Sequence, residues 1–247
     1  ILECIENEKF WLTGVIVSDG RSSPRSGMYE HLGDQEMVAL RLKEQHYAGV
    51  VGGYAACIHL MHSEQGKLLA ESDLHEFENL VEDLKQSIQA TRPSVVFTHN
   101  LADSHPHHTL VALASIRALR ELGPDYYPLE FYGGEVWRSL DWMPLHDKLA
   151  FDVGQHQNLT ASLMGVFDSQ IGGGKRYDLA TAGRKRANAT YYDPLATDHS
   201  LALEYAMDLL PLLKNPALDP VEYSLGLIHR FARNVERQLR QVWPQRI

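Results

Sequence analysis

Three histidines and one aspartate lie within the six-residue segment Asp103-Ser104-His105-Pro106-His107-His108. A neutral imidazole is the commonest zinc ligand, and a carboxylate is also a zinc donor. A protonated imidazole beside a metal can stabilise an oxyanion or protonate a leaving group. A polar helix cap needs none of this chemistry, and the residue types alone leave both interpretations open.

The elements around this segment predict where it lies. Residues 94–98 are typical of a buried strand, and Pro106 suits the first position of a helix over residues 106–122. His105 would then be the N-cap of this helix and His108 would lie in its first turn, so that the two imidazoles converge. Because open α/β sheets bind ligands beyond the carboxyl ends of their strands, this turn is the expected position of a site.

Strands and helices alternate along the chain, which predicts an α/β fold with a mostly parallel sheet and helices on both faces. We expect a single domain over residues 1–247, with an amphipathic C-terminal helical extension over residues 221–247 whose arginines oppose an apolar face. The predicted strands cover residues 10–17, 50–51, 94–98 and 129–132, and the predicted helices cover residues 34–47, 74–88, 106–122, 159–168, 200–213 and 221–242.

The composition excludes several classes of function. The 247 residues contain 23 Lys and Arg against 32 Asp and Glu, a formal charge of −9, which argues against nucleic acid as the main partner. No apolar stretch approaches the ~20 residues of a membrane span. Cys4 and Cys57 cannot form a disulfide framework, which favours a cytoplasmic location. The arginine face of the C-terminal helix leaves a homo-oligomer open.

Four separated motifs carry a resemblance to a known family: Gly14 to Gly20, Arg41-Leu42-Lys43-Glu44, residues 98–108, and Asp168-Ser169-Gln170. In this order they resemble the PIG-L/LmbE-like family of zinc-dependent N-deacetylases. The resemblance covers most of the chain to about Tyr192. It implies a Rossmann-like fold and a hydrolase that removes an acetyl group from an N-acetylglucosaminyl substrate or a similar small amide.

The resemblance also implies roles for individual residues. His108 matches the family's zinc-ligand histidine, His105 matches the histidine that stabilises the oxyanion or acts as an acid, and Arg41 matches an arginine that contacts substrate. We also expect Asp103 to contact substrate. His107 stands where the family has Asp, so Asp103 or another acid would have to orient the catalytic imidazole.

A second departure from the family concerns the first strand and the loop after it. Family members carry an Ala-His-Pro-Asp-Asp-like segment there, which supplies two metal ligands and the general base, and no residue of this chain matches it. Because one imidazole does not retain zinc, we expect weak zinc binding and little deacetylase activity until that segment is restored. The alternative function is a non-catalytic carbohydrate-binding relative that has lost the metal site.

One further segment, Glu135-Val136-Trp137-Arg138 with Trp142, allows two interpretations. The tryptophans could line a sugar pocket by stacking, or they could pack at the rim of the core. The sequence alone leaves both open.

Overall fold

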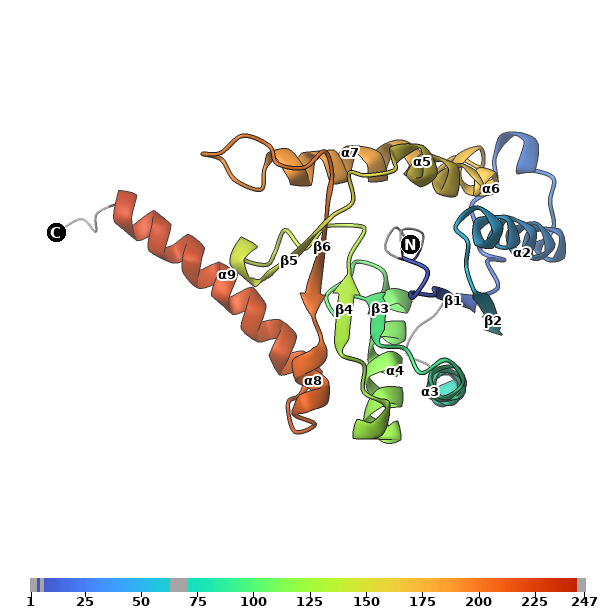
Figure 1. Ribbon diagram of the computed structural model, residues 1–247, viewed down its shortest axis with the longest axis horizontal. Helices are drawn as coiled ribbons and strands as arrows, with labels where there is room; N and C mark the ends of the chain where they lie inside the picture. The colour runs from blue at the N-terminus through green and yellow to red at the C-terminus, as the bar shows by residue number, and fades with distance from the viewer. Residues whose placement is uncertain (1–3, 5–6, 63–70, 244–247) are drawn as a thin grey trace. The chain divides into compact units, whose positions relative to one another are not determined.

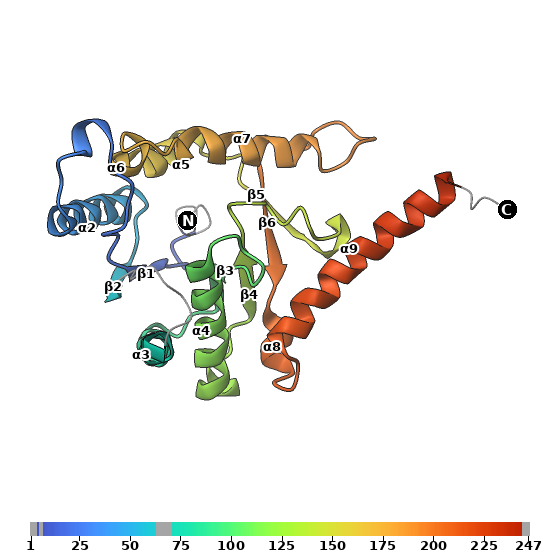
Figure 2. The ribbon, with the colours of Figure 1, turned by 180° about the vertical axis from the view of Figure 1, so that it is seen from behind.

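The computed structural model describes residue 4, residues 7–62 and residues 71–243. These residues form two compact units, Ile1–Glu76 with Asp152–Leu203 and Phe77–Phe151 with Glu204–Ile247. The first unit contains a two-stranded sheet and the second contains a four-stranded sheet. The elements are labelled in Figure 1 and are seen from behind in Figure 2. The α/β fold class is therefore confirmed.

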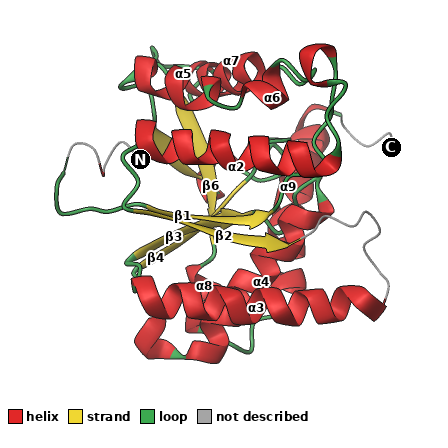
Figure 3. Ribbon diagram, turned by 90° about the vertical axis from the view of Figure 1, so that its right-hand side faces the viewer, coloured by secondary structure: helices red, strands yellow, loops and turns green. Residues whose placement is uncertain are grey.

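In the first unit, strands β1 (Thr13–Ser18) and β2 (Ala56–His62) pair in parallel, and helix α2 (Asp34–Val51) connects them. Parallel neighbours require such a crossover, and α2 contacts β2. Figure 3 shows α2 near the other helices of this unit. These are η1 (Gly27–Tyr29), α5 (Gln157–Gly165), α6 (Asp168–Ile171) and α7 (Tyr177–Thr190).

The strand predicted at residues 50–51 is wrong, because both residues belong to the last turn of α2. The side chain of Val50 is 68 % exposed, whereas a buried strand would cover it. Gly52 follows the helix, and Gly53 adopts a φ of 61°, which a glycine accepts without steric cost. A two-residue apolar run is too short for its periodicity to separate strand from helix.

The second unit has the strand order β3-β4-β6-β5. Strand β3 (Val95–His99) is parallel to β4 (Glu130–Gly134), with His99 opposite Gly134, and β4 is antiparallel to β6 (Leu203–Asp208). The sheet ends with β5 (Leu149–Asp152). The helices that belong to this unit or continue into it are α3 (Glu71–Thr91), α4 (Pro106–Leu122), η2 (Pro124–Tyr126), η3 (Leu145–Asp147), α8 (Leu210–Lys214) and α9 (Pro220–Val242).

The helix predicted over residues 200–213 is also wrong, since this segment forms β6 and then α8. Leu203, Tyr205, Ala206 and Met207 are all buried. A strand that is covered on both faces shows a continuous apolar run instead of alternation, and such a run resembles a buried helix in the sequence.

Helix α4 is the crossover between β3 and β4, and it packs on β3 and on α8. The Thr98 and Ser115 hydroxyl groups lie 3.2 Å apart, which ties the strand to the helix. Fully buried Ala112, Ala114 and Ala118 allow the helix to approach closely. This packing fixes the carboxyl end of β3, from which the following turn projects.

The predicted C-terminal amphipathic helix is confirmed as α9. The carboxylate of Asp219 caps it by accepting hydrogen bonds from the Val221 and Glu222 amides at 2.7 and 3.2 Å. Its first turns pack on the unit through buried Ser224 and Leu227. Among the described residues, no helix is both long and apolar enough to cross a membrane.

We predict that Arg120→Met lowers the free energy of unfolding by about 2 kcal/mol, measured by urea denaturation. The Arg120 guanidinium donates to the Leu212 carbonyl at 2.8 Å and to the Leu218 carbonyl at 2.7 Å. Methionine keeps the apolar stem and leaves both carbonyls without this charged donor. Arg117→Met is the matched control, because Arg117 makes exposed ion pairs worth about 0–1 kcal/mol. Equal losses for the two variants would contradict the prediction.

Candidate functional site

The turn between β3 and α4 is folded by its own polar side chains. Buried Asn100 accepts a hydrogen bond from the Ala102 amide at 2.8 Å and places its own amide 3.2 Å from the Met207 sulfur. Asp103 Oδ1 accepts the His105 amide at 2.8 Å. Such Asx turns let a short loop reverse direction while its backbone donors stay paired. The turn therefore presents Asp103 and the start of α4 beside the end of β3.

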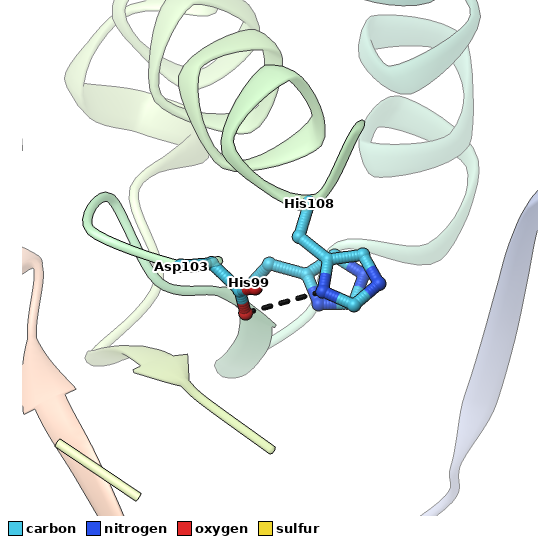
Figure 4. A group of neighbouring side chains, drawn as sticks. All are labelled: His99, Asp103 and His108. Carbon is cyan, nitrogen blue, oxygen red and sulfur yellow. Dashed lines mark ion pairs between the residues drawn. The ribbon is translucent and has the colours of Figure 1, made fainter. Parts of the chain in front are cut away.

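His99, Asp103 and His108 meet at this turn (Figure 4). One ligand atom from each lies within 4.8 Å of the others. Asp103 Oδ2 is 3.1 Å from His108 Nδ1. The His99 and His108 rings stack with centroids 3.9 Å apart and an interplanar angle of 3°. The three side chains thus offer two imidazoles and one carboxylate to a single small volume.

His105 is the N-cap of α4, as the sequence predicts, and its side chain makes no capping hydrogen bond. Its ring centroid lies 4.7 Å from that of His108. The imidazole is therefore directed to the cluster and away from the backbone amides of its own helix. This position suits a group that acts on a substrate bound beside the cluster.

The electrostatics of the cluster favour a neutral imidazole at His99. Burial lowers the pKa of His99 to about 4, and the nearby His108 contributes to this shift. His99 is therefore uncharged at neutral pH, which leaves a ring lone pair for a ligand bond. The Asp103 side chain is fully buried.

Several buried polar atoms of the cluster lack hydrogen bonds in the part of the chain that the structure describes. They are Asp103 Oδ2, His105 Nδ1 and His108 Nδ1. Buried polar atoms are rarely left without a partner in native proteins, because this is energetically costly. Two imidazoles and a carboxylate match the ligand preferences of zinc and related divalent ions. The residues present therefore fit a divalent cation.

The structure brings together three of the four predicted site residues, His105, His108 and Asp103. His99 has no predicted role in the sequence, although it is the last residue of β3 and this position is a signal for a ligand. A residue that ends a parallel strand lies at the edge where open α/β sheets bind ligands. The position of His99 at the end of a predicted strand could therefore have identified it as a candidate ligand.

Arg41, the fourth predicted site residue, belongs to the first unit. Its guanidinium lies 2.7 Å from the buried Glu44 carboxylate and 5.1 Å from the ring centroid of Phe167. Glu44 also accepts the Ser169 amide at 2.6 Å and the Ser169 hydroxyl at 2.7 Å. Two motifs separated by more than 100 residues are thus joined by one carboxylate.

A second contact of the same unit joins the Tyr29 hydroxyl to Asp168. The hydrogen bond to this carboxylate raises the pKa of Tyr29 to about 12. Asp168 and Ser169, which belong to one sequence motif, are therefore both engaged with earlier parts of the chain. The substrate-binding role of Arg41 stays a prediction.

Comparison with known proteins finds a family model that matches the first part of the chain. Residues 5–119 match the PIG-L family, described as GlcNAc-PI de-N-acetylase. No curated protein matches the sequence.

Solved structures of similar fold include a conserved protein of Thermus thermophilus, with 17 % identity, a TM-score of 0.62, and coverage of 88 % of this chain and 90 % of that one. The N,N'-diacetylchitobiose deacetylase of Pyrococcus horikoshii has 15 % identity, a TM-score of 0.63, and coverage of 87 % and 78 %. The 4-carboxy-2-hydroxymuconate hydratase of Pseudomonas putida has 12 % identity, a TM-score of 0.62, and coverage of 84 % and 88 %.

At these identities the solved structures establish the fold alone. The family match covers the turn that carries His99, Asp103, His105 and His108. The resemblance to the PIG-L/LmbE-like family is therefore confirmed over residues 5–119, which contain three of the four sequence motifs.

Proposed function

We propose that this chain is a divalent-metal-dependent hydrolase that removes an acetyl group from an N-acetylated amino sugar or a similar small amide. The observation that carries the proposal is the cluster of two imidazoles and a carboxylate with ligand atoms within 4.8 Å, next to the imidazole of His105. The PIG-L family match and the fold shared with a diacetylchitobiose deacetylase support it.

His99, Asp103 and His108 would hold the cation, most simply zinc. A bound divalent cation polarises the amide carbonyl and lowers the pKa of a water molecule. Asp103 Oδ2 lies 3.1 Å from His108 Nδ1, and a cation would give both buried atoms the partner that they lack. His105 would donate a hydrogen bond to the tetrahedral oxyanion, or it would take the proton that the attacking water loses and deliver it to the leaving amine. Its position at the N-terminus of α4 favours negative charge beside it.

Two expectations from the sequence change in this proposal. Asp103 acts on His108 and the cation instead of the substrate, because its side chain is fully buried. Weak zinc binding was expected from a single imidazole, but His99 and Asp103 add two donors to His108. We therefore propose that the chain binds a divalent cation. The small-molecule substrate, the cytoplasmic location and the homo-oligomer stay predictions.

We predict that His108→Ala weakens zinc binding on the order of 100-fold or more, measured by calorimetry on chelator-treated protein, because the cation loses one of three protein ligands. His107→Ala is the matched control, because His107 is the preceding residue and contributes no ligand atom to the cluster. Zinc affinity that is the same in both variants would contradict the ligand assignment.

We predict that the zinc-loaded protein releases acetate and free amine in equal amounts from N-acetylglucosamine or N,N'-diacetylchitobiose, and that a chelator abolishes the release. His105→Ala should lower kcat about 10²- to 10⁴-fold while the bound zinc is retained, because general acid catalysis contributes about this factor.

Three outcomes separate the alternatives. Sugar binding without acetate release would favour the non-catalytic carbohydrate-binding relative. Addition of water to an unsaturated acid without amine release would favour the chemistry named for the hydratase of similar fold. Unchanged kcat in His105→Ala would remove His105 from the mechanism.

A further inference from the structure

Apolar residues recur with a strict heptad spacing along helix α9. Their separation alternates between three and four residues, and the members are Leu225, Ile228, Ala232, Val235, Leu239 and Val242. Val221 continues the same spacing toward the start of the helix, so the repeat extends over about three heptads. A repeat of 3.5 residues places its members in a narrow stripe on one side of a helix, as in a coiled coil. We call the six residues the seam of α9.

The seam is exposed in the part of the chain that the structure describes. The exposed fractions are 38 % for Leu225, 37 % for Val235, 62 % for Leu239 and 83 % for Val242. Helix α9 packs on the second unit with a different side, through buried Ser224 and Leu227. Leu227 and Ile228 lie about 100° apart around the helix, because an α-helix has 3.6 residues per turn. Beyond its first turns α9 extends away from the sheet of its unit (Figure 1), so the described residues leave the seam uncovered.

The charges of α9 favour a second helix over an anionic membrane as the surface that covers the seam. Four arginines line a groove on the opposite side of the helix, and they are Arg230, Arg233, Arg237 and Arg240. Arginines on the polar side also occur in helices that lie on anionic membranes. In α9, however, Arg230 is paired with Asp147 at 3.1 Å and Arg240 with Glu236 at 2.7 Å. Glu236 also borders the seam, and the whole chain carries a formal charge of −9, so attraction to anionic lipid is weak.

The area of the seam is sufficient for a reversible dimer. Phe231 and Trp243 border the seam, and their exposed fractions are 39 % and 75 %. A fully buried Val or Leu side chain removes roughly 60–120 Å² from water, and an aromatic side chain removes about 150–250 Å². Together with the two aromatic residues, the exposed part of the seam would bury roughly 600 Å² per copy, or about 1,200 Å² in total. This total reaches the lower end of the range of stable protein interfaces.

We propose that the seam of α9 is the self-association surface of this protein, on which α9 of a second copy packs as a coiled coil. A second copy brings a seam of the same length and the same spacing, so that each apolar side chain can insert between side chains of the partner helix. Because the same surface is used on both copies, the contact closes on itself as a symmetric dimer. The inference does not depend on the proposed hydrolase activity.

The first test measures the mass of the full chain by sedimentation over a range of concentrations. We expect a reversible dimer with a Kd of about 1–100 µM, because an interface of this modest area gives modest affinity. Leu239→Glu should weaken association about 100-fold or more, because the dimer would bury a carboxylate without a partner. Gln241→Glu is the matched control, because it adds the same charge on the arginine side of the helix and should leave the Kd unchanged.

Ala232→Leu tests the seam in the opposite direction. Ala232 is the smallest residue of the seam and is exposed, so a larger apolar side chain adds area to the interface without displacing a neighbour in the single chain. The variant should tighten association about tenfold, a gain that a misfolded protein does not produce. Far-UV circular dichroism below the Kd should be the same for Leu239→Glu, Ala232→Leu and the unaltered protein, because both side chains are exposed in the single chain.

The membrane alternative is measured by flotation of the protein with vesicles of phosphatidylcholine and phosphatidylglycerol, to which we expect no binding. Binding that Leu239→Glu abolishes would assign the seam to a lipid surface and overturn the inference. A chain that stays monomeric at every concentration, or an equal Kd for Leu239→Glu and Gln241→Glu, would also overturn it.

Discussion

The parallel pairing of β3 with β4 is the constraint on which the candidate site depends. Because the two strands run in the same direction, His99 and Gly134 lie opposite each other at one edge of the sheet. The crossover helix α4 must then begin at this edge, which brings His105 and His108 to the end of β3. The segments that directly follow β3 and β4 therefore begin at the same edge of the sheet.

Buried carboxylates shape this edge. Asp103 follows β3 and contacts an imidazole, whereas Glu135 follows β4 and accepts hydrogen bonds from a loop. Burial raises the pKa of Glu135, and the charge of Asp103 adds to this shift. Two acidic groups in one low-dielectric region are tolerated because each has cationic or hydrogen-bonding partners of its own. The two carboxylates therefore have different structural roles. Asp103 belongs to the histidine cluster, and Glu135 holds the loop that follows β4.

A third buried carboxylate gives the first unit its long-range connection. Glu44 accepts hydrogen bonds from Arg41 and from both donors of Ser169, so α2 and α6 are joined at one point. The Arg41-Leu42-Lys43-Glu44 and Asp168-Ser169-Gln170 motifs thus have a structural reason to occur together. Arg41 is held by Glu44 and lies over Phe167, and this fixes the direction of its guanidinium.

Local sequence was sufficient to predict much of this molecule. The strand before residue 100, the helix that begins at Pro106, His105 as its N-cap and the amphipathic helix α9 all follow from residue types within one or two turns. The expected burial of that strand is wrong, because Val95 and Phe97 are 38 % and 64 % exposed. The two wrong assignments, a strand at residues 50–51 and a helix over residues 200–213, fell on apolar runs where periodicity is uninformative. The secondary structure of a short or fully buried apolar run depends on the residues that pack against it. The sequence of the run alone does not show which residues these are.

The tertiary structure decided which residues meet. His99 lies beside His108, the Asp103 side chain is fully buried, and the buried Glu135 holds the loop that follows β4. Short-range spacing in the sequence predicts none of these contacts. Residue types and motif order were enough to predict the family resemblance and the chemistry that we propose for the site. Strand pairing and burial determined the geometry, because contacts between residues distant in sequence depend on the free energy of the whole packed core.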